Sequence, residues 1–188
     1  MKDKSKGRLV VISAPSGTGK GTVINMILEL RPEFIFSVSA TTRKPRPGET
    51  DGVEYHFLTK DDFLKMIARD ELLEYAEYVG EFYGTPVKPI IDAVESGKTI
   101  ILDIEVQGAK QVMSKMSKAM TVFIVPPDMK ELESRLRGRG TDSEEKLAAR
   151  LERACQELNE KKHYDHIIIN DSVSRAAEEI INIIDRKD

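Results

Sequence analysis

The chain has 188 residues, of which 32% are charged and 40% hydrophobic, a composition typical of a globular protein with one core. The formal net charge of −3 argues against a general nucleic-acid-binding protein, because such proteins carry a surplus of Lys and Arg. No apolar segment reaches membrane-spanning length and no secretory apolar region follows Met1, so we expect a cytoplasmic protein with no membrane partner. Cys155 is the only cysteine, which excludes an intrachain disulfide, and its place in an apolar helical repeat predicts a core position.

The first predicted elements are a buried strand over 8–13 and a helix over 22–30, joined by a glycine-rich turn. Gly17 and Gly19 allow backbone N–H groups to turn inward, because no Cβ blocks the curl. These donors and the positive end of the helix dipole attract phosphate, and Lys20 can reach the outer phosphates from the helix start. The order of strand, turn and helix predicts a phosphate-binding loop.

Two positions depart from the loop motif G-x-x-x-x-G-K-[ST]. Ala14 stands where the motif has glycine, which is a small change. Gly21 stands where the motif has Ser or Thr, so the hydroxyl that normally contacts Mg²⁺ is missing there. Thr22 is the next hydroxyl along the chain, and it could serve the metal directly or through water.

A stretch of about 34–85 interrupts the alternation of strands and helices, so we interpret it as an inserted substrate-binding subdomain. The strands predicted within it are 36–39, 55–58, 72–79 and 81–84. Its loop 41–49 carries Arg43 and Arg46 on a segment stiffened by prolines, which predicts an anion clamp. A basic surface loop without a ligand is the alternative.

After the insertion, the buried strand 99–102 ends at Asp103, which makes Asp103 a candidate magnesium group; a carboxylate that only caps a helix is the alternative. An arginine-bearing segment of about 137–150 lies between two predicted helices and suggests a lid over a triphosphate. The element order predicts an α/β fold, a parallel sheet with helices on both faces and ligands at the carboxyl ends of its strands. We expect a single domain over 1–188, with a core of 1–33 and 86–188.

Motifs spread over nearly the whole chain resemble those of guanylate kinases, which are nucleoside monophosphate kinases of the P-loop class. The motifs are APSGTGK (14–20), SVSATTRKPRPGE (37–49), LEYA (73–76), YGT (83–85), LDIEVQG (102–108), LRGRG (136–140) and ND (170–171). The resemblance implies transfer of the terminal phosphoryl group of ATP to GMP, with Mg²⁺, in purine nucleotide metabolism. It implies ATP and GMP as the partners, and no nucleic acid.

The resemblance also implies roles for individual residues. The GMP phosphate would be held by Arg43, Arg46, Tyr55 and Tyr83, and the guanine read by Ser39, Glu74, Thr85 and Asp103. ATP would be bound by Ala14, Pro15, Ser16, Gly17, Thr18, Gly19, Lys20, Gly21, Thr22, Arg135 and Asn170. The transferred group would be stabilised by Lys20, Arg43, Arg139 and Arg150. The metal ligand stays open between Thr22 and Asp103, and Glu105 stands where the family pattern leads us to expect Asp.

The chemistry of guanine supports the role of Glu74 independently. Guanine presents N1–H and an exocyclic amine side by side, and one carboxylate can accept hydrogen bonds from both. Adenine lacks this pair of donors and would leave the carboxylate unpaired. The sequence also suggests two alternative functions. Another nucleoside monophosphate kinase is suggested by Gly21-Thr22, but the Arg43/Arg46 loop and Glu74 argue against it. A non-catalytic guanylate-kinase-like module is opposed by Lys20.

Overall fold

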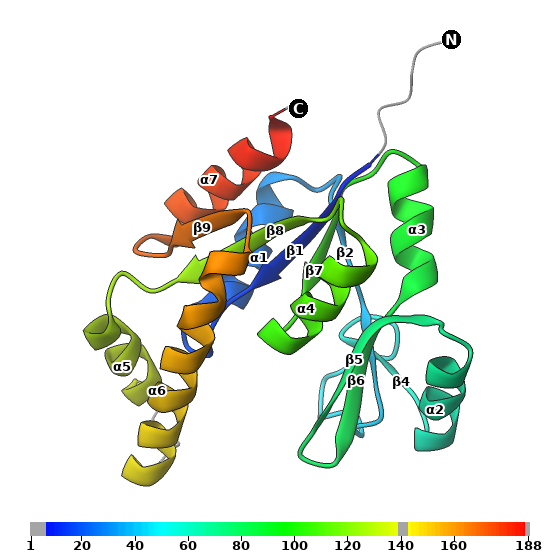
Figure 1. Cartoon of the computed structure of the whole chain (residues 1–188), viewed down its shortest axis with the longest axis horizontal. Coiled ribbons are helices and arrows are strands. Elements are labelled where there is room, and N and C mark those ends of the chain that lie inside the picture. The colour runs from blue at the N-terminus through cyan, green and yellow to red at the C-terminus, as the bar shows by residue number, and fades with distance from the viewer. Residues whose placement is uncertain (1–6, 139–142, 187–188) are drawn as a thin grey trace. The chain divides into compact units, whose positions relative to one another are not determined.

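The computed structural model describes residues 7–138 and 143–186 (Figure 1). The elements are β1 (Leu9–Ser13), α1 (Lys20–Leu30), β2 (Ile35–Phe36), β3 (Ser39–Thr41), β4 (Tyr55–Phe57), α2 (Lys60–Ala68), β5 (Leu72–Tyr78), β6 (Glu81–Pro86), α3 (Val87–Glu95), β7 (Ile100–Asp103), α4 (Val106–Lys115), β8 (Met120–Val125), α5 (Met129–Arg137), α6 (Glu144–Leu158), the 3₁₀ helix η1 (Asn159–His163), β9 (His166–Ile169) and α7 (Val173–Asp185). None of the helices in these ranges is long and apolar enough to cross a membrane.

Five strands form a sheet in the order β2-β7-β1-β8-β9, and the pairs β2–β7, β1–β8 and β8–β9 are parallel. All five residues of β1 are buried, as are the last five of β8. Successive side chains of a strand point to opposite faces, so a strand buried at every position must be covered on both. The predicted α/β fold with a parallel, helix-covered sheet is therefore confirmed.

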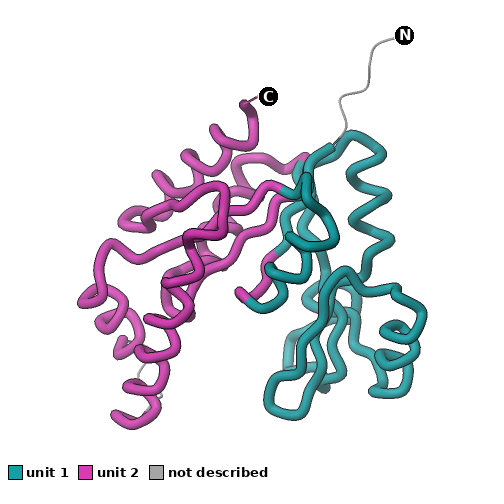
Figure 2. Tube along the Cα trace, viewed as in Figure 1, with its two compact units in different colours: residues 1–9, 34–102, 107–119 teal, residues 10–33, 103–106, 120–188 magenta. Residues whose placement is uncertain are grey.

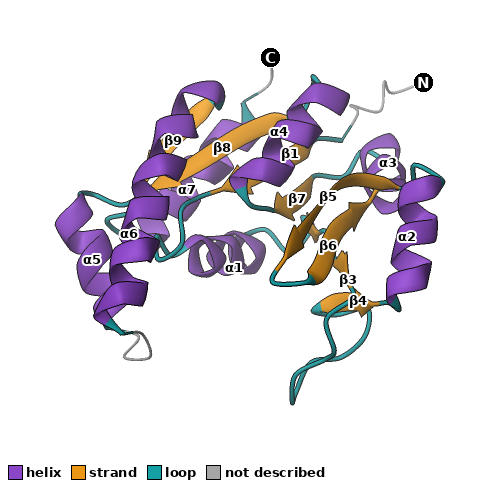
Figure 3. Cartoon of the chain, turned by 60° about the horizontal axis from the view of Figure 1, so that its bottom comes forward, coloured by secondary structure: helices purple, strands orange, loops and turns teal. Residues whose placement is uncertain are grey.

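A second sheet has the order β4-β3-β6-β5, with β3–β4 parallel and the pairs β3–β6 and β5–β6 antiparallel. Helix α2 lies beside this sheet (Figure 3). Phe63 of α2 is fully buried and forms a small apolar cluster with Ala40 and Leu72. Thr59 caps the helix by accepting a hydrogen bond from the backbone N–H of Asp62.

The strand predicted over 36–39 is wrong as one element, because the chain changes sheets within it. Ile35 and Phe36 pair with β7, whereas Ser39 begins β3 of the second sheet. The crossing occurs at buried Ser37, whose backbone N–H donates to Ile101 O at 2.9 Å. Alternating apolar residues indicate extended backbone, but they do not indicate which sheet the backbone joins.

The prediction that Cys155 lies in the core is wrong. Cys155 is exposed, and its neighbour Ala154 is buried instead. The buried face of α6 is formed with Leu147 and Leu151, so the repeat continues through position 154 and not 155. A step of one residue turns a side chain by about 100° around a helix. Helix α1 also begins at Lys20, earlier than the predicted 22.

The chain forms two compact units (Figure 2). The first contains residues up to Leu9, Phe34–Leu102 and Gln107–Ala119, and so includes the second sheet with α2, α3 and most of α4. The second contains Val10–Glu33, Asp103–Val106 and the residues from Met120 onward. In the second unit, α1 packs against α7. The division into core, insertion and lid stays a prediction.

Candidate active site

The glycine-rich turn follows β1 as predicted and depends on two glycines with left-handed backbone. Gly17 has φ 89° and Gly19 has φ 86°, values that side chains with a Cβ rarely adopt. A Cβ on Gly17 would lie 2.6 Å from the Leu136 side chain, and one on Gly19 would lie 2.7 Å from Asn170 Nδ2. Both glycines are thus required by conformation and by close packing. Within the described residues, no side chain caps the N-terminus of α1, so its N–H groups remain available for an anion.

Three side chains of the second unit hold this loop from outside. Asn170 Nδ2 donates to the backbone oxygen of Thr18 at 2.7 Å, and Arg135 Nη1 donates to the same oxygen at 3.2 Å. Arg135 also donates to Asn170 O at 3.0 Å, while Arg150 Nη2 donates to Ser16 Oγ at 2.8 Å. The structure therefore brings to the phosphate loop Arg135 and Asn170, predicted to bind ATP, and Arg150, predicted to stabilise the transferred group.

Lys20 is the first residue of α1, and its charge is balanced in this structure. Its ammonium pairs with the Asp103 carboxylate and donates to Ile104 O at 3.1 Å. The same oxygen accepts a hydrogen bond from buried Ser13 Oγ at 2.9 Å. The end of β7 and the start of α1 are thereby connected through charged and polar groups. A phosphate that reached Lys20 would compete with Asp103 for the ammonium.

A magnesium ion would find few protein ligands here. The described residues contain no group of three or more His, Cys, Asp or Glu side chains arranged to hold a metal. Gly21 offers no side-chain oxygen, Thr22 is an exposed hydroxyl on α1, and Asp103 is a carboxylate beside the loop. Mg²⁺ commonly takes one or two protein oxygens and completes its shell with waters and substrate phosphates, so these residues fit it.

Arg139, predicted to act in catalysis, lies outside the described residues, as does the centre of the predicted lid. The helices on either side are described. Arg137 near the end of α5 forms a bidentate pair with Glu144 at the start of α6, with donor–acceptor distances of 2.5 and 3.0 Å. Arg153 pairs with Glu105 at 2.8 Å, so Glu105 has a partner in the second unit that the sequence does not indicate.

In the first unit, the predicted anion clamp contains an internal carboxylate. Arg43 donates from both terminal nitrogens to Glu49, each at 2.9 Å, and Glu49 also accepts from the backbone N–H of Arg46 at 2.7 Å. The guanidinium lowers the pKa of Glu49 through these hydrogen bonds. Arg43 lies 5.4 Å above the Tyr55 ring, which contacts the Tyr83 ring edge-on at 6.1 Å. Arg43, Tyr55 and Tyr83 are thus brought together, while the Arg46 side chain is exposed.

Glu74 and Thr85 form a buried polar pair on neighbouring strands. They are opposite each other in the β5–β6 ladder, and their side chains are 5% and 0% exposed. Thr85 Oγ1 donates to Glu74 Oε1 at 2.6 Å. Burial raises the pKa of the Glu74 carboxyl, while the Thr85 hydrogen bond and the charge of Lys115 act in the opposite direction. A buried carboxylate with one oxygen outside this bond is suited to accept further hydrogen bonds. Ser39, also predicted to read guanine, starts β3 opposite Tyr55.

Comparison with known proteins gives a consistent result. The sequence model of the family described as "Guanylate kinase" matches residues 6–187. A guanylate kinase of Lactococcus lactis is 50% identical over 182 residues, which cover 97% of this chain and 89% of that protein. One from Synechocystis is 46% identical over 179 residues, covering 95% and 94%. The crystal structure of guanylate kinase from Anaplasma phagocytophilum has a TM-score of 0.77 and 36% identity, and the match covers 96% of this chain and 85% of that one.

Proposed function

The chain belongs to the guanylate kinase family, and we propose that its two units supply separate binding groups for ATP and GMP. The protein transfers the terminal phosphoryl group of ATP to GMP, giving ADP and GDP. We propose on this basis a role in purine nucleotide metabolism and a cytoplasmic location. The buried Glu74–Thr85 pair is the observation that carries the assignment of residues below.

We assign guanine recognition to Glu74, whose carboxylate accepts from N1–H and the exocyclic amine of the base. Thr85 already donates its hydroxyl hydrogen to Glu74, so it holds the carboxylate in place rather than donating to O6. We therefore assign Ser39 as the residue whose hydroxyl donates a hydrogen bond to guanine O6. For Asp103 two roles are open, guanine contact and magnesium ligand, and its ion pair with Lys20 favours the second.

The GMP phosphate is assigned to Arg43, Arg46, Tyr55 and Tyr83. Arg43 is held by two hydrogen bonds to Glu49 and by the Tyr55 ring, so its guanidinium group is oriented before any ligand binds. An incoming phosphate would share or replace the carboxylate on the guanidinium. Such a pre-oriented arginine loses little conformational entropy on binding.

ATP is assigned to the phosphate loop of 14–22. Backbone N–H groups at the loop and at the start of α1 surround the phosphates, and Lys20 exchanges Asp103 for phosphate oxygens. Arg135 and Asn170 keep the loop in shape through Thr18 O. Thr22 and Asp103 would hold magnesium, which supplies neutralisation of phosphate charge when bound.

Phosphoryl transfer then requires positioning and charge stabilisation rather than a general base, because the accepting oxygen of GMP is already ionised. Lys20, Arg43, Arg139 and Arg150 are proposed to stabilise the charge of the group in transit. Arg150 reaches the loop at Ser16, which supports its assignment to this step. Exclusion of water from the bound nucleotides prevents loss of the phosphoryl group by hydrolysis.

The role of Glu74 is tested with Glu74→Gln. This variant keeps the shape of the side chain but replaces one carboxylate oxygen, a hydrogen-bond acceptor, with an amide NH2 group, which is a donor. The Michaelis constant for GMP should rise at least tenfold, corresponding to ~1.4 kcal/mol, while that for ATP stays within twofold. Steady-state ADP release at varied GMP and ATP measures both constants. Equal constants for wild type and variant would remove Glu74 from guanine recognition.

A further inference from the structure

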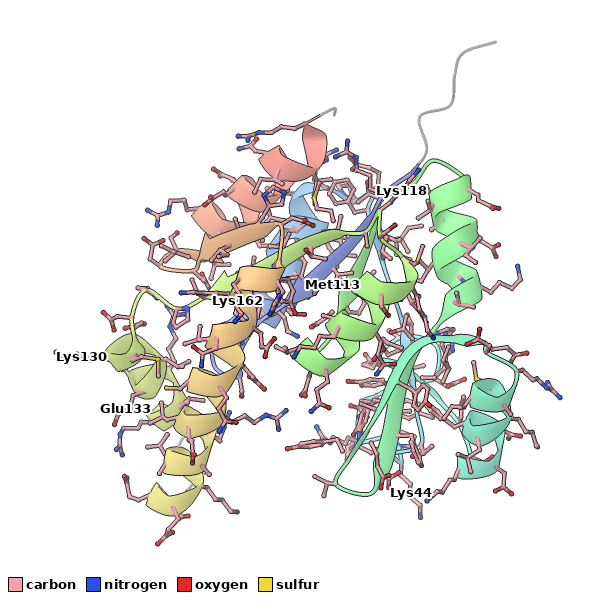
Figure 4. All side chains as sticks on the ribbon, in the orientation of Figure 1. Lys44, Met113, Lys118, Lys130, Glu133 and Lys162 are labelled. Atoms are coloured by element: carbon pink, nitrogen blue, oxygen red, sulfur yellow. The ribbon has the colours of Figure 1, made fainter. Side chains whose placement is uncertain are left out.

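We propose that one face of α4 positions Glu74 for guanine recognition, through Gly108, Gln111 and Lys115. These three are positioning residues, because they act on the substrate only through Glu74. The inference rests on the proposed function of Glu74. All the contacts that carry it lie within the first unit, between α4 and the strand β5. Figure 4 shows the side chains of α4, where Met113 is labelled.

Gly108 leaves the space that the Glu74 carboxylate occupies. A Cβ on Gly108 would lie 2.5 Å from Glu74 Oε2 and 3.1 Å from its Cδ. Gly108 is helical and its backbone does not have a positive φ, so its conformation does not require glycine. Glycine also destabilises a helix relative to alanine. The close approach of the carboxylate therefore explains glycine at this position.

Gln111 pairs with the open edge of β5 beside Glu74. Among the strands that the structure describes, β5 is last in its sheet, so one row of its backbone groups has no strand partner there. Gln111 Nε2 donates to Tyr75 O at 2.8 Å, and Tyr75 N donates to Gln111 Oε1 at 3.2 Å. The side-chain amide thus takes the place of the peptide group of a neighbouring strand, and it fixes the residue that follows Glu74.

Lys115 fixes β5 on the other side of Glu74. Its ammonium donates to Leu72 O at 3.2 Å, two residues before Glu74. The β5–β6 pairing is irregular between Leu72 and Glu74, so the ladder itself constrains this segment less than a regular one. Gly108, Gln111 and Lys115 are separated by three and four residues, and this spacing places them on one side of a helix. α4 therefore holds the backbone before and after Glu74 and shapes the space around its carboxylate.

Accurate placement matters because guanine offers two adjacent donors to one carboxylate. A shift of about 1 Å in a positioned group can reduce a rate about 10²-fold. In Gly108→Ala, the new methyl group would displace the end of a flexible side chain, not backbone. The variant should therefore lose guanine recognition while keeping its fold, a combination that a purely structural role for Gly108 does not give.

The experiment compares Gly108→Ala with Ser114→Ala, a matched control on the same helix. The Ser114 hydroxyl donates to the backbone oxygen of Gln111, three residues earlier in the helix. Gly108→Ala should raise the KM for GMP about tenfold, a change of ~1.4 kcal/mol. The KM for ATP should stay unchanged, and the melting temperature of the variant should not fall. Its preference for GMP over inosine monophosphate, which lacks the exocyclic amine, should fall. Gln111→Ala should likewise raise the KM for GMP and lower the preference for GMP over inosine monophosphate. Ser114→Ala should change neither quantity.

A double-variant cycle separates this inference from the role of Glu74 itself. In a Glu74→Gln background, Gly108→Ala should have no further effect on the KM for GMP, because the group it displaces no longer recognises guanine. If Glu74→Gln alone leaves that constant unchanged, the proposed role of Glu74 fails. If Glu74→Gln raises it but Gly108→Ala and Gln111→Ala both stay within twofold of wild type, the positioning role of α4 is overturned.

Discussion

At the scale of single residues, Glu74 combines deep burial with a proposed role in guanine recognition that needs its charge. Burial raises its pKa, and Thr85 on the neighbouring strand donates a hydrogen bond to its carboxylate. Such a group destabilises the folded protein when ionised, and active sites commonly retain groups of this kind because function requires them. Guanine would add hydrogen bonds to this carboxylate beyond the one that Thr85 donates.

Glu74→Gln should therefore raise stability while it lowers activity. A raised folded-state pKa means that protonation stabilises the fold below the unfolded-state pKa of about 4.3, and that this contribution is lost as pH rises through the folded-state value. Glutamine does not ionise, so the variant should melt higher than wild type at pH 7, by about 2–4 °C per kcal/mol gained. The difference should shrink towards pH 4. Melting curves at the two pH values measure it.

The control for that experiment is Glu77→Gln, an exposed glutamate on the same strand. It should leave the melting temperature unchanged at both pH values, because an exposed carboxylate pays no comparable desolvation penalty. A Glu74→Gln variant that melts below wild type at pH 7 would contradict the view that the buried carboxylate destabilises the fold.

Lys20 gives a second prediction at the residue scale. Lys20→Ala should reduce kcat about 10²–10³-fold, the usual effect of removing one group that stabilises transition-state charge. GMP affinity measured by calorimetry should survive, because the residues assigned to GMP phosphate and guanine recognition do not include Lys20. The exposed Lys130 on α5 provides the control, Lys130→Ala, with unchanged turnover. Unchanged turnover in Lys20→Ala would refute the role given to this lysine.

The sequence identified most candidate residues but not the bonds that orient them. Glu49 is the last residue of the motif 37–49, yet nothing in the sequence indicates that its two carboxylate oxygens both accept hydrogen bonds from Arg43. The same is true of Gly108, whose role depends on a carboxylate 34 positions earlier in the chain. Contacts between distant segments follow from tertiary packing, and local patterns do not encode them.

At the scale of elements, the start of α1 contains the departure from the loop motif. Among the described residues, nothing lies within 4 Å of a Cβ built on Gly21, and its φ is not positive. A side chain at this position therefore meets neither a steric nor a backbone obstacle. The glycine is not needed by the fold, in contrast to Gly17 and Gly19.

Gly21→Ser should therefore fold normally and restore the hydroxyl that the motif supplies to magnesium. The magnesium concentration for half-maximal activity should fall about fivefold, as expected for ~1 kcal/mol of added interaction. Gly21→Ala is the matched control, since it adds the Cβ without the oxygen. Magnesium titrations at saturating ATP and GMP measure the effect. If the serine and alanine variants behave alike, the hydroxyl at this position does not serve the metal.

Some helices and strands can be predicted from local sequence patterns alone, and others cannot. The hairpin predicted over 72–84 is found as β5 and β6, because alternation and the Gly80 turn act locally. The segment 36–39 was predicted as one strand but joins two sheets, and α6 buries Ala154 where Cys155 was expected. Both errors concern which neighbour an element packs against, which sequence periodicity alone does not determine.

At the scale of the whole molecule, the order of elements was sufficient to predict the parallel sheet. Buried strands alternating with helices permit few arrangements, and β1 and β8 are buried at nearly every position as that fold requires. The strand order β4-β3-β6-β5 of the second sheet was not predicted, because mixed parallel and antiparallel pairing leaves no periodic signal. Motifs distributed over the chain predicted the family, which the comparisons then showed.

The central claim is that this chain phosphorylates GMP and selects it by its guanine. The most direct test is a coupled assay of ADP release with ATP and, in turn, GMP, AMP, UMP and CMP. We expect kcat/KM for GMP to exceed that for AMP by about 10⁴ or more, because adenine leaves the buried Glu74 carboxylate unpaired. Equal use of GMP and AMP would contradict the account.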